Sequence, residues 1–214
     1  MYVLFDLDGT LVDSGPAHRR AAENAFRDRG LVIEEEVVVR FLVAHDAASA
    51  DMPPDVYFDL WKRMQPLYRL EQESIAAFPG IADLLASLPA QGIRPGIVTS
   101  KRRWAVEREL RRLGWLEDFA CVVCRDDTQH HKPSPEPILH AMRQLGGRPV
   151  AYVGDAPSDV QAAKAAGLPA IGVIWGWAGG PALRAAGADF VLEDPAAILP
   201  LLREIGRADL EADA

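Results

Sequence analysis

Two aspartates at the end of an apolar run are the clearest candidates in this chain for residues that bind a ligand or take part in a reaction. Asp6 and Asp8 follow the apolar segment Met1–Phe5, and Gly9 comes directly after them. Side chains two residues apart on a strand point to one side, so these carboxylates repel each other unless a cation, such as a divalent metal, lies between them. A glycine lets the chain turn and leaves nearby amides open to an anion. The segment therefore predicts a site for phosphate and magnesium.

Polar side chains also follow three later strand-like segments. Thr99 and Ser100 end one of them, where a hydroxyl serves either as a helix N-cap or as part of a phosphate site. Lys132 precedes a rigid Pro-x-Pro-x-Pro turn in a chain with few lysines, which favours a specific point charge. Asp155 closes an apolar strand, and Asp159 follows in the first helical turn, where an acid can also serve only to offset the helix dipole.

Short apolar runs that could position these residues alternate with helical patterns along most of the chain. The runs of strand length are Tyr2–Phe5, Pro95–Thr99, Ala120–Cys124, Val150–Val153, Ala170–Ile174 and Phe190–Leu192. Between them apolar residues recur with helical spacing, as in the segment 81–88. The alternation predicts an α/β fold in which a Rossmann-like parallel sheet has helices on both faces. Such sheets bind ligands at the carboxyl ends of their strands, where the strand order reverses.

One long interval breaks this alternation soon after the first strand. It contains no convincing strand, and helical patterns dominate around Ala17–Arg29, Glu34–Leu42 and Val56–Leu70. We therefore expect a small helical cap over residues 15–78, inserted into a core formed by residues 1–14 and 79–205. The acidic residues 206–214 are expected to form a short frayed tail.

The bulk composition argues against several classes of protein. A length of 214 residues suits one sizeable domain, or a core domain with a smaller insertion. The formal net charge of −8 argues against nucleic acid as the main partner. No apolar stretch reaches the roughly 18 residues of a membrane-spanning helix, and no membrane partner is expected. Asp6 and Asp8 interrupt what would have to be the apolar region of a signal peptide.

Cys121 and Cys124 form a C-x-x-C pair within an apolar run. Residues three apart on a strand face opposite sides, so the two thiols should diverge. Redox pairs of this kind lie instead at a helix N-terminus, and a metal site needs a second pair of ligands at suitable spacing. We interpret both as buried structural thiols, which indicates a reducing compartment and hence a cytoplasmic protein.

The four polar segments together resemble the motifs of the haloacid dehalogenase superfamily, in the same order and with similar spacing. The matching residues are Asp6-x-Asp8-Gly9-Thr10 for the first motif, Thr99 for the second, Lys132 for the third and Gly154-Asp155-x-x-x-Asp159 for the fourth. The resemblance covers essentially the whole chain. It is closest to the phosphoglycolate phosphatase-like branch, whose members have a small helical cap of the C1 type.

This resemblance implies a phosphatase that works through an aspartyl-phosphate intermediate. Asp6 would be the nucleophile. Asp8 would protonate the leaving alkoxide and then take a proton from the attacking water. Mg²⁺ would be held by Asp6, the backbone carbonyl of Asp8, Asp155 and Asp159, the last either directly or through water.

The resemblance also implies which residues bind the phosphoryl group. They are Thr99 and Ser100, the loop around Leu7 and Gly9 through its amides, and Lys132, which would offset negative charge. A small cap that closes over the site would restrict the pocket to small molecules. The expected substrate is therefore a small organic phosphate monoester.

Three other functions stay open at this point. A phosphomutase of the beta-phosphoglucomutase type shares the Asp-x-Asp pair and a similar cap. The sequence Gly9-Thr10-Leu11-Val12 nevertheless favours water as the acceptor of the phosphoryl group. Inorganic pyrophosphate is also small enough to be the substrate. An inactive binding or regulatory module is the third, but all four motifs are intact.

Substrate choice should depend on the cap, where His18 and His45 are the candidate specificity residues. His45 lies in Val43-Ala44-His45-Asp46-Ala47, about where related caps have a loop that contains glycine. This segment has none, which argues against phosphoglycolate itself as the substrate. Outside the cap, Trp175 and Trp177 are expected to pack near the site, at the end of the fifth strand.

Overall fold

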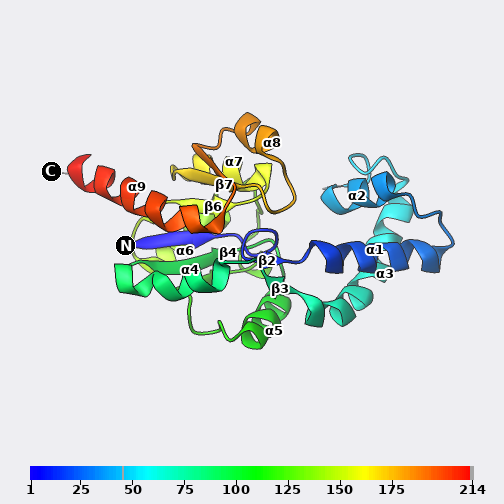
Figure 1. Ribbon diagram of the computed structural model, residues 1–214. Coiled ribbons are helices and arrows are strands. Elements are labelled where there is room, and N and C mark those ends of the chain that lie inside the picture. Colours follow the sequence, from blue (N-terminus) through cyan, green and yellow to red (C-terminus); the bar gives the residue numbers. More distant parts are fainter. Residues whose placement is uncertain (45, 213–214) are drawn as a thin grey trace. The chain divides into compact units, whose positions relative to one another are not determined.

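The computed structural model of the chain describes residues 1–44 and 46–212. It divides into two compact units, which we call the core unit (Met1–Asp13 with Ala76–Ala214) and the helical unit (Ser14–Ile75). Figure 1 shows both units and labels most of their helices and strands.

The core unit is built on a six-stranded sheet in which all neighbouring strands are parallel. Its strands are β1 (Tyr2–Phe5), β4 (Arg94–Val98), β5 (Val122–Val123), β6 (Tyr152–Gly154), β7 (Ala170–Val173) and β8 (Phe190–Leu192). Their order in the sheet is β5-β4-β1-β6-β7-β8. The chain moves outward from β1 to β5 on one side and from β6 to β8 on the other, so the strand order reverses at β1. This confirms the predicted Rossmann-like sheet and places the end of β1 where such sheets bind ligands.

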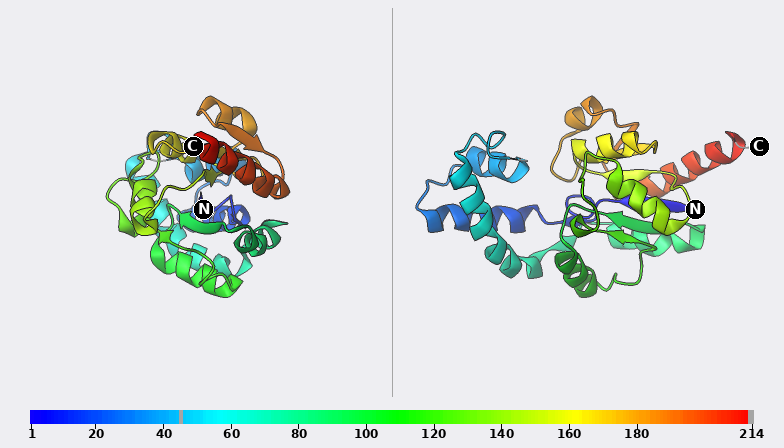
Figure 2. Two further views of the ribbon diagram at one scale, coloured as in Figure 1. Left: turned by 90° about the vertical axis from the view of Figure 1, so that its left-hand side faces the viewer. Right: turned by 180° about the vertical axis from the view of Figure 1, so that it is seen from behind.

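Helices lie on both faces of this sheet, as predicted. The core unit contains the helices α4 (Ile81–Ser87), α5 (Arg103–Leu113), α6 (Glu136–Leu145), α7 (Pro157–Ala165), α8 (Gly180–Ala185) and α9 (Ile198–Ala212), with short 3-10 turns at Pro89–Gln91, Arg125–Asp127 and Pro195–Ala197. The view down the strands in Figure 2 shows α6 and α7 on the opposite side of the sheet from α4 and α9. Apolar residues of α6, α7 and α8 pack with sheet residues such as Leu4 and Val98 in one buried cluster.

The structure differs from the sequence predictions at two places along the chain. First, β2 (Val12–Asp13) and β3 (Ala76–Ala77) form an antiparallel pair, which the sequence did not predict because two residues are too few to show a periodicity. Second, residues 206–212 belong to α9, so the frayed tail predicted there was wrong up to residue 212. The buried residues Leu202 and Ile205 anchor the first half of this helix to the core unit, and the following residue, Gly206, is buried as well.

Both cysteines are unbridged and buried, as predicted for structural thiols. Burial raises the pKa of Cys121 to about 11 and that of Cys124 to about 12. The thiols are therefore protonated and unreactive at neutral pH.

In the described residues of the helical unit, 14–44 and 46–75, there are three α-helices and one short 3-10 turn. They are α1 (Gly15–Arg29), α2 (Glu35–Val43), α3 (Pro54–Glu71) and Gln72–Ser74. Gly30 ends α1 in the left-handed conformation, and its amide donates to carbonyls of the last helical turn. Phe41 lies at the centre of the unit's buried cluster, with ring centroids 5.6 Å from Phe26 and 5.7 Å from Tyr57, both edge-to-face.

Within the residues that the structure describes, none of the helices combines the length and the apolar character needed to cross a membrane.

Candidate active site

The end of β1 carries the first two predicted site residues on a tight loop. Asp6 is buried, and its amide donates to the carbonyl of Val153 in β6, so the neighbouring strand fixes its backbone. The carbonyl of Leu7 accepts the amides of Leu11 and Val12 at 2.9 and 3.0 Å, which curls the chain back on itself. The Asp6 side chain is therefore held at the carboxyl edge of the sheet.

Lys132 links the carboxylates of two separate segments. Its Nζ lies 2.7 Å from Asp6 Oδ1 and 2.5 Å from Asp159 Oδ1, and it also donates to the Tyr152 hydroxyl at 3.0 Å. Burial disfavours a charged lysine, but the attraction of Asp159 and Asp6 outweighs this and raises the pKa of Lys132 well above its usual value. Lys132 is therefore a buried permanent cation between two carboxylates.

Asp155 is held by groups from two loops. Its Oδ1 accepts the Thr10 hydroxyl at 3.2 Å, and its Oδ2 accepts the Trp177 amide at 2.7 Å. Gly9, with a φ of 82°, and Gly176 both pass so close to this carboxylate that a Cβ on either would collide with Asp155 Oδ2. Glycine is therefore required at these two positions to let the loops close around Asp155.

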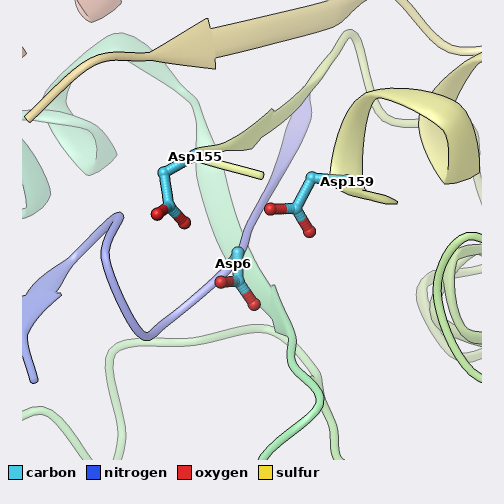
Figure 3. A group of neighbouring side chains, drawn as sticks. All are labelled: Asp6, Asp155 and Asp159. Carbon is cyan, nitrogen blue, oxygen red and sulfur yellow. The ribbon is translucent and has the colours of Figure 1, made fainter. Parts of the chain in front are cut away.

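Three buried aspartates form a group that fits a divalent cation. Asp6 comes from the end of β1, Asp155 from the end of β6 and Asp159 from the first turn of α7, and Figure 3 shows their carboxylates turned toward one another. Each offers an oxygen within 4.8 Å of the others. Oxygen donors of this kind suit a hard cation such as Mg²⁺ or Ca²⁺.

The charges around these aspartates also favour a cation. Burial and the neighbouring Asp159 raise the pKa of Asp6 to about 7, although Lys132 opposes the shift. Burial, with repulsion from Asp159 and Asp6, raises the pKa of Asp155 well above its ordinary value. One lysine cannot offset three carboxylates, so further positive charge at this position would keep Asp6 ionised at neutral pH.

Asp8 and Thr99 lie beside a second buried lysine. The Nζ of Lys101 is 2.8 Å from Asp8 Oδ1 and 2.7 Å from Oε2 of Glu109 on α5. The Thr99 hydroxyl oxygen accepts the amide of Lys101 at 3.2 Å. Burial and repulsion from Asp8 raise the pKa of Glu109 to about 7 against the opposing effect of Lys101. The end of β4 and the middle of α5 are thus joined to the β1 loop.

Other residues predicted for phosphate binding have different surroundings. The Leu7 side chain is fully buried, so only its backbone can face a ligand. The amide of Gly9 donates to the Val12 carbonyl at 2.9 Å, so this amide is already used within the loop. Ser100 is exposed at the end of β4.

The two histidines proposed for specificity belong to the other unit. In the helical unit His18 Nδ1 bonds to the Ser14 carbonyl at 2.9 Å, and its ring lies 4.3 Å from that of Tyr68. His45 lies outside the described residues. Their role in substrate choice stays a prediction.

Sequence reasoning missed several polar residues that support the site. Tyr152 is buried on β6 and donates its hydroxyl to the Val98 carbonyl at 2.8 Å while contacting Lys132. The sequence patterns place Thr10 in a motif without assigning it a role, and they do not predict Glu109 as a site residue. A polar or acidic side chain within an otherwise apolar strand or helix face was the available signal. Trp175 and Trp177 do pack at the site as expected, and the Trp175 indole donates to the Thr10 carbonyl at 3.0 Å.

This fold and site define a doubly wound α/β protein with a carboxylate and lysine centre at the point where the strand order reverses. The chain belongs to the haloacid dehalogenase-like hydrolase family, whose sequence pattern it matches over residues 3–173.

Individual relatives agree with this assignment. The chain is 31% identical to phosphoglycolate phosphatase of Salmonella typhimurium, over 94% of this chain and 91% of that protein. Among solved structures, a hydrolase from Pseudomonas syringae has a TM-score of 0.79 and 27% identity, covering 96% of this chain and 99% of that one. A haloacid dehalogenase-like hydrolase from Streptococcus pneumoniae has a TM-score of 0.82 at 21% identity, covering 94% and 97%, and so shares the fold.

Proposed function

We propose that this protein is a Mg²⁺-dependent phosphatase that hydrolyses a small organic phosphate monoester through an aspartyl-phosphate on Asp6. The observation that carries the proposal is the ion pair between Lys132 and Asp6 at the point where the strand order reverses. It holds a buried carboxylate in place with one oxygen paired to a cation. The proposal includes a cytoplasmic location and no nucleic acid or membrane partner, in keeping with the net charge of −8.

The reaction follows from the residues at the end of β1. An Asp6 oxygen attacks phosphorus, the bond from phosphorus to the ester oxygen breaks, and Asp8 gives that oxygen a proton. Asp8 then takes a proton from a water molecule that attacks phosphorus, which releases phosphate and restores Asp6. Lys132 offsets the charge of Asp6 and of the transferring group, and Thr99 donates its hydroxyl to a phosphoryl oxygen.

The metal would be held by Asp6, Asp155, Asp159 and the backbone carbonyl of Asp8. When bound, Mg²⁺ supplies positive charge that keeps the carboxylates ionised and stabilises charge on the phosphoryl oxygens. Thr10 and the Trp177 amide orient Asp155 for this role through the hydrogen bonds described above.

Phosphate release from p-nitrophenyl phosphate and from a panel of phosphorylated metabolites, including pyrophosphate, tests the proposal. Small monoesters should be turned over with Mg²⁺ and not with EDTA. Asp6→Asn should lower turnover by at least about 10⁴-fold. Asp13→Asn is the matched control, because Asp13 is an exposed aspartate of the same unit.

Three outcomes would overturn the proposal. An Asp6→Asn protein that still hydrolyses the esters would exclude Asp6 as the nucleophile. Cleavage of phosphoproteins alone would exclude a small-molecule substrate. Transfer of the phosphoryl group to a second hydroxyl of a sugar phosphate, without release of phosphate, would identify a mutase instead.

A further inference from the structure

A second lysine and carboxylate system lies next to the one that holds Asp6. Lys101 follows β4 and is buried, and its Nζ lies between Asp8 Oδ1 and Glu109 Oε2 at 2.8 and 2.7 Å. The Glu109 side chain is completely buried, whereas that of Asp8 is 21% exposed. The order from the interior to the surface is therefore Glu109, Lys101, Asp8.

Packing alone gives no reason for an acid at position 109. The buried face of α5 is otherwise formed by Ala105, Val106 and Leu110. Glu109 Oε1 has no hydrogen-bond partner among the described residues. A buried ion pair generally contributes less to stability than an apolar residue of similar size. Apolar residues in place of both Lys101 and Glu109 should therefore suit the fold at least as well as the ion pair does.

The two lysines have the same kind of surroundings, but each contacts a different catalytic carboxylate. Lys132 pairs Asp159 with Asp6, and Lys101 pairs Glu109 with Asp8. In each case a buried acid on a helix, α7 or α5, fixes a lysine that in turn contacts a carboxylate of the β1 loop. The Lys101 amide also donates to Thr99, which fixes the backbone from which this lysine extends.

We propose that Lys101 and Glu109 are positioning residues that hold the Asp8 carboxylate for proton transfer to the leaving group. This inference depends on the proposed function, in which Asp8 is the general acid. Glu109 fixes the lysine, and the lysine fixes one Asp8 oxygen. Loss of Lys101 removes the contact that fixes this oxygen, and loss of Glu109 removes the group that fixes Lys101, so the proton is delivered less often to the departing oxygen.

Comparing two esters tests this role, because their leaving groups need a proton to different degrees. p-Nitrophenolate departs without much protonation, whereas the alkoxide of an alkyl phosphate needs the acid. For Lys101→Met, kcat/KM on glycerol phosphate should fall at least about tenfold more than kcat/KM on p-nitrophenyl phosphate. kcat/KM is the right quantity, since it covers only the steps up to departure of the leaving group.

A second variant separates loss of positioning from misfolding. Lys101→Met leaves Glu109 buried without its partner, so the double variant Lys101→Met/Glu109→Gln, which neutralises both, carries the same prediction. Glu109→Gln alone keeps an oxygen that can accept a hydrogen bond from Lys101. This variant should therefore show a smaller loss of kcat/KM on glycerol phosphate relative to p-nitrophenyl phosphate. Lys164→Met is the matched control, because it removes the exposed pair of Lys164 with Asp189 at 2.6 Å and should leave both esters unchanged.

The Asp8→Asn background separates positioning from packing. There the addition of Lys101→Met should cause no further loss on the alkyl ester, since the acid is already gone. Equal losses on both esters, or a full further loss in the Asp8→Asn background, would overturn the positioning role while leaving the proposed function intact. A wild-type protein that cleaves neither of these esters nor any monoester of the metabolite panel would overturn the proposed function itself.

Discussion

The core unit and the helical unit bury different kinds of side chain. Among the described residues, every charged side chain that is buried belongs to the core unit, and these are Asp6, Lys101, Glu109, Lys132, Asp155 and Asp159. The buried polar residues of the helical unit, Ser14 and Gln72, carry no charge. Its ion pairs among the described residues are exposed, as between Arg19 and Glu35, or partly exposed, as between Arg29 and Asp59.

This contrast indicates that the buried charges of the core unit lower the stability of the protein. Removing a charge from water costs several kcal/mol unless it is paired and hydrogen-bonded, and even then the balance is often unfavourable. The core unit accepts that cost at the end of β1, where charged groups can act on a substrate. The helical unit is instead stabilised by aromatic packing around Phe41. Loss of a buried side chain should therefore lower activity in the core unit and stability in the helical unit, and loss of a buried charge in the core unit should even raise stability.

The largest expected effect on stability is in the helical unit. Phe41→Ala should lower the free energy of unfolding of this unit by about 3–5 kcal/mol, because it leaves a cavity among the aromatic rings. Urea unfolding followed by circular dichroism measures the loss. Phe58→Ala is the matched control, since Phe58 is 67% exposed in the same unit. An equally large loss for Phe58→Ala would contradict the view that packing around Phe41 stabilises this unit.

The second prediction tests the charged centre of the core unit. Lys132→Met should lower kcat/KM for phosphate esters by about 10²–10³-fold, because it removes the cation paired with Asp6 and Asp159. Steady-state kinetics on p-nitrophenyl phosphate measure the loss, with Lys164→Met as the control for removing a lysine pair at the surface. A Lys132→Met protein with nearly full activity would show that the pair is structural only.

The smallest expected effect is a gain in stability that accompanies loss of the nucleophile. Burial raises the pKa of Asp6 to about 7 from an ordinary value of 3.8. Between these values the folded state holds a proton that the unfolded state lacks, so the stability of the metal-free wild type falls as pH rises. Asn does not titrate, so Asp6→Asn should be more stable by about 0.5–2 kcal/mol near neutral pH.

Thermal unfolding in EDTA at about pH 4 and about pH 7.5 measures this gain, which should disappear at the lower pH because both proteins are then neutral at position 6. Asp28→Asn, at an exposed position of the helical unit, should change little at either pH. A metal-free Asp6→Asn protein that is less stable than the wild type near neutral pH would contradict the cost assigned to the buried carboxylate.

The α/β sheet and the polar residues at the ends of its strands could be predicted from local patterns in the sequence. Asp6, Thr99 and Asp155 could be found because each follows an apolar strand, and parallel strands end at one edge of a sheet. Lys132 could be found from its place before a proline-rich turn. Local spacing was enough for these residues, since each signal lies within a few positions of the chain.

The partners of these residues could not be predicted in this way, because they depend on how the chain folds in three dimensions. Three contacts of the site join residues that are far apart in the sequence. The hydrogen bond of Tyr152 to Val98 spans 54 residues, and that of the Trp177 amide to Asp155 spans 22. The contact of Lys101 with Asp8 spans 93 residues. No sequence periodicity spans such separations, because these contacts depend on how the strands are ordered and how the loops pack. The same Asp-x-Asp pair is therefore visible in the sequence as two carboxylates, and in the folded chain as two carboxylates held by different lysines.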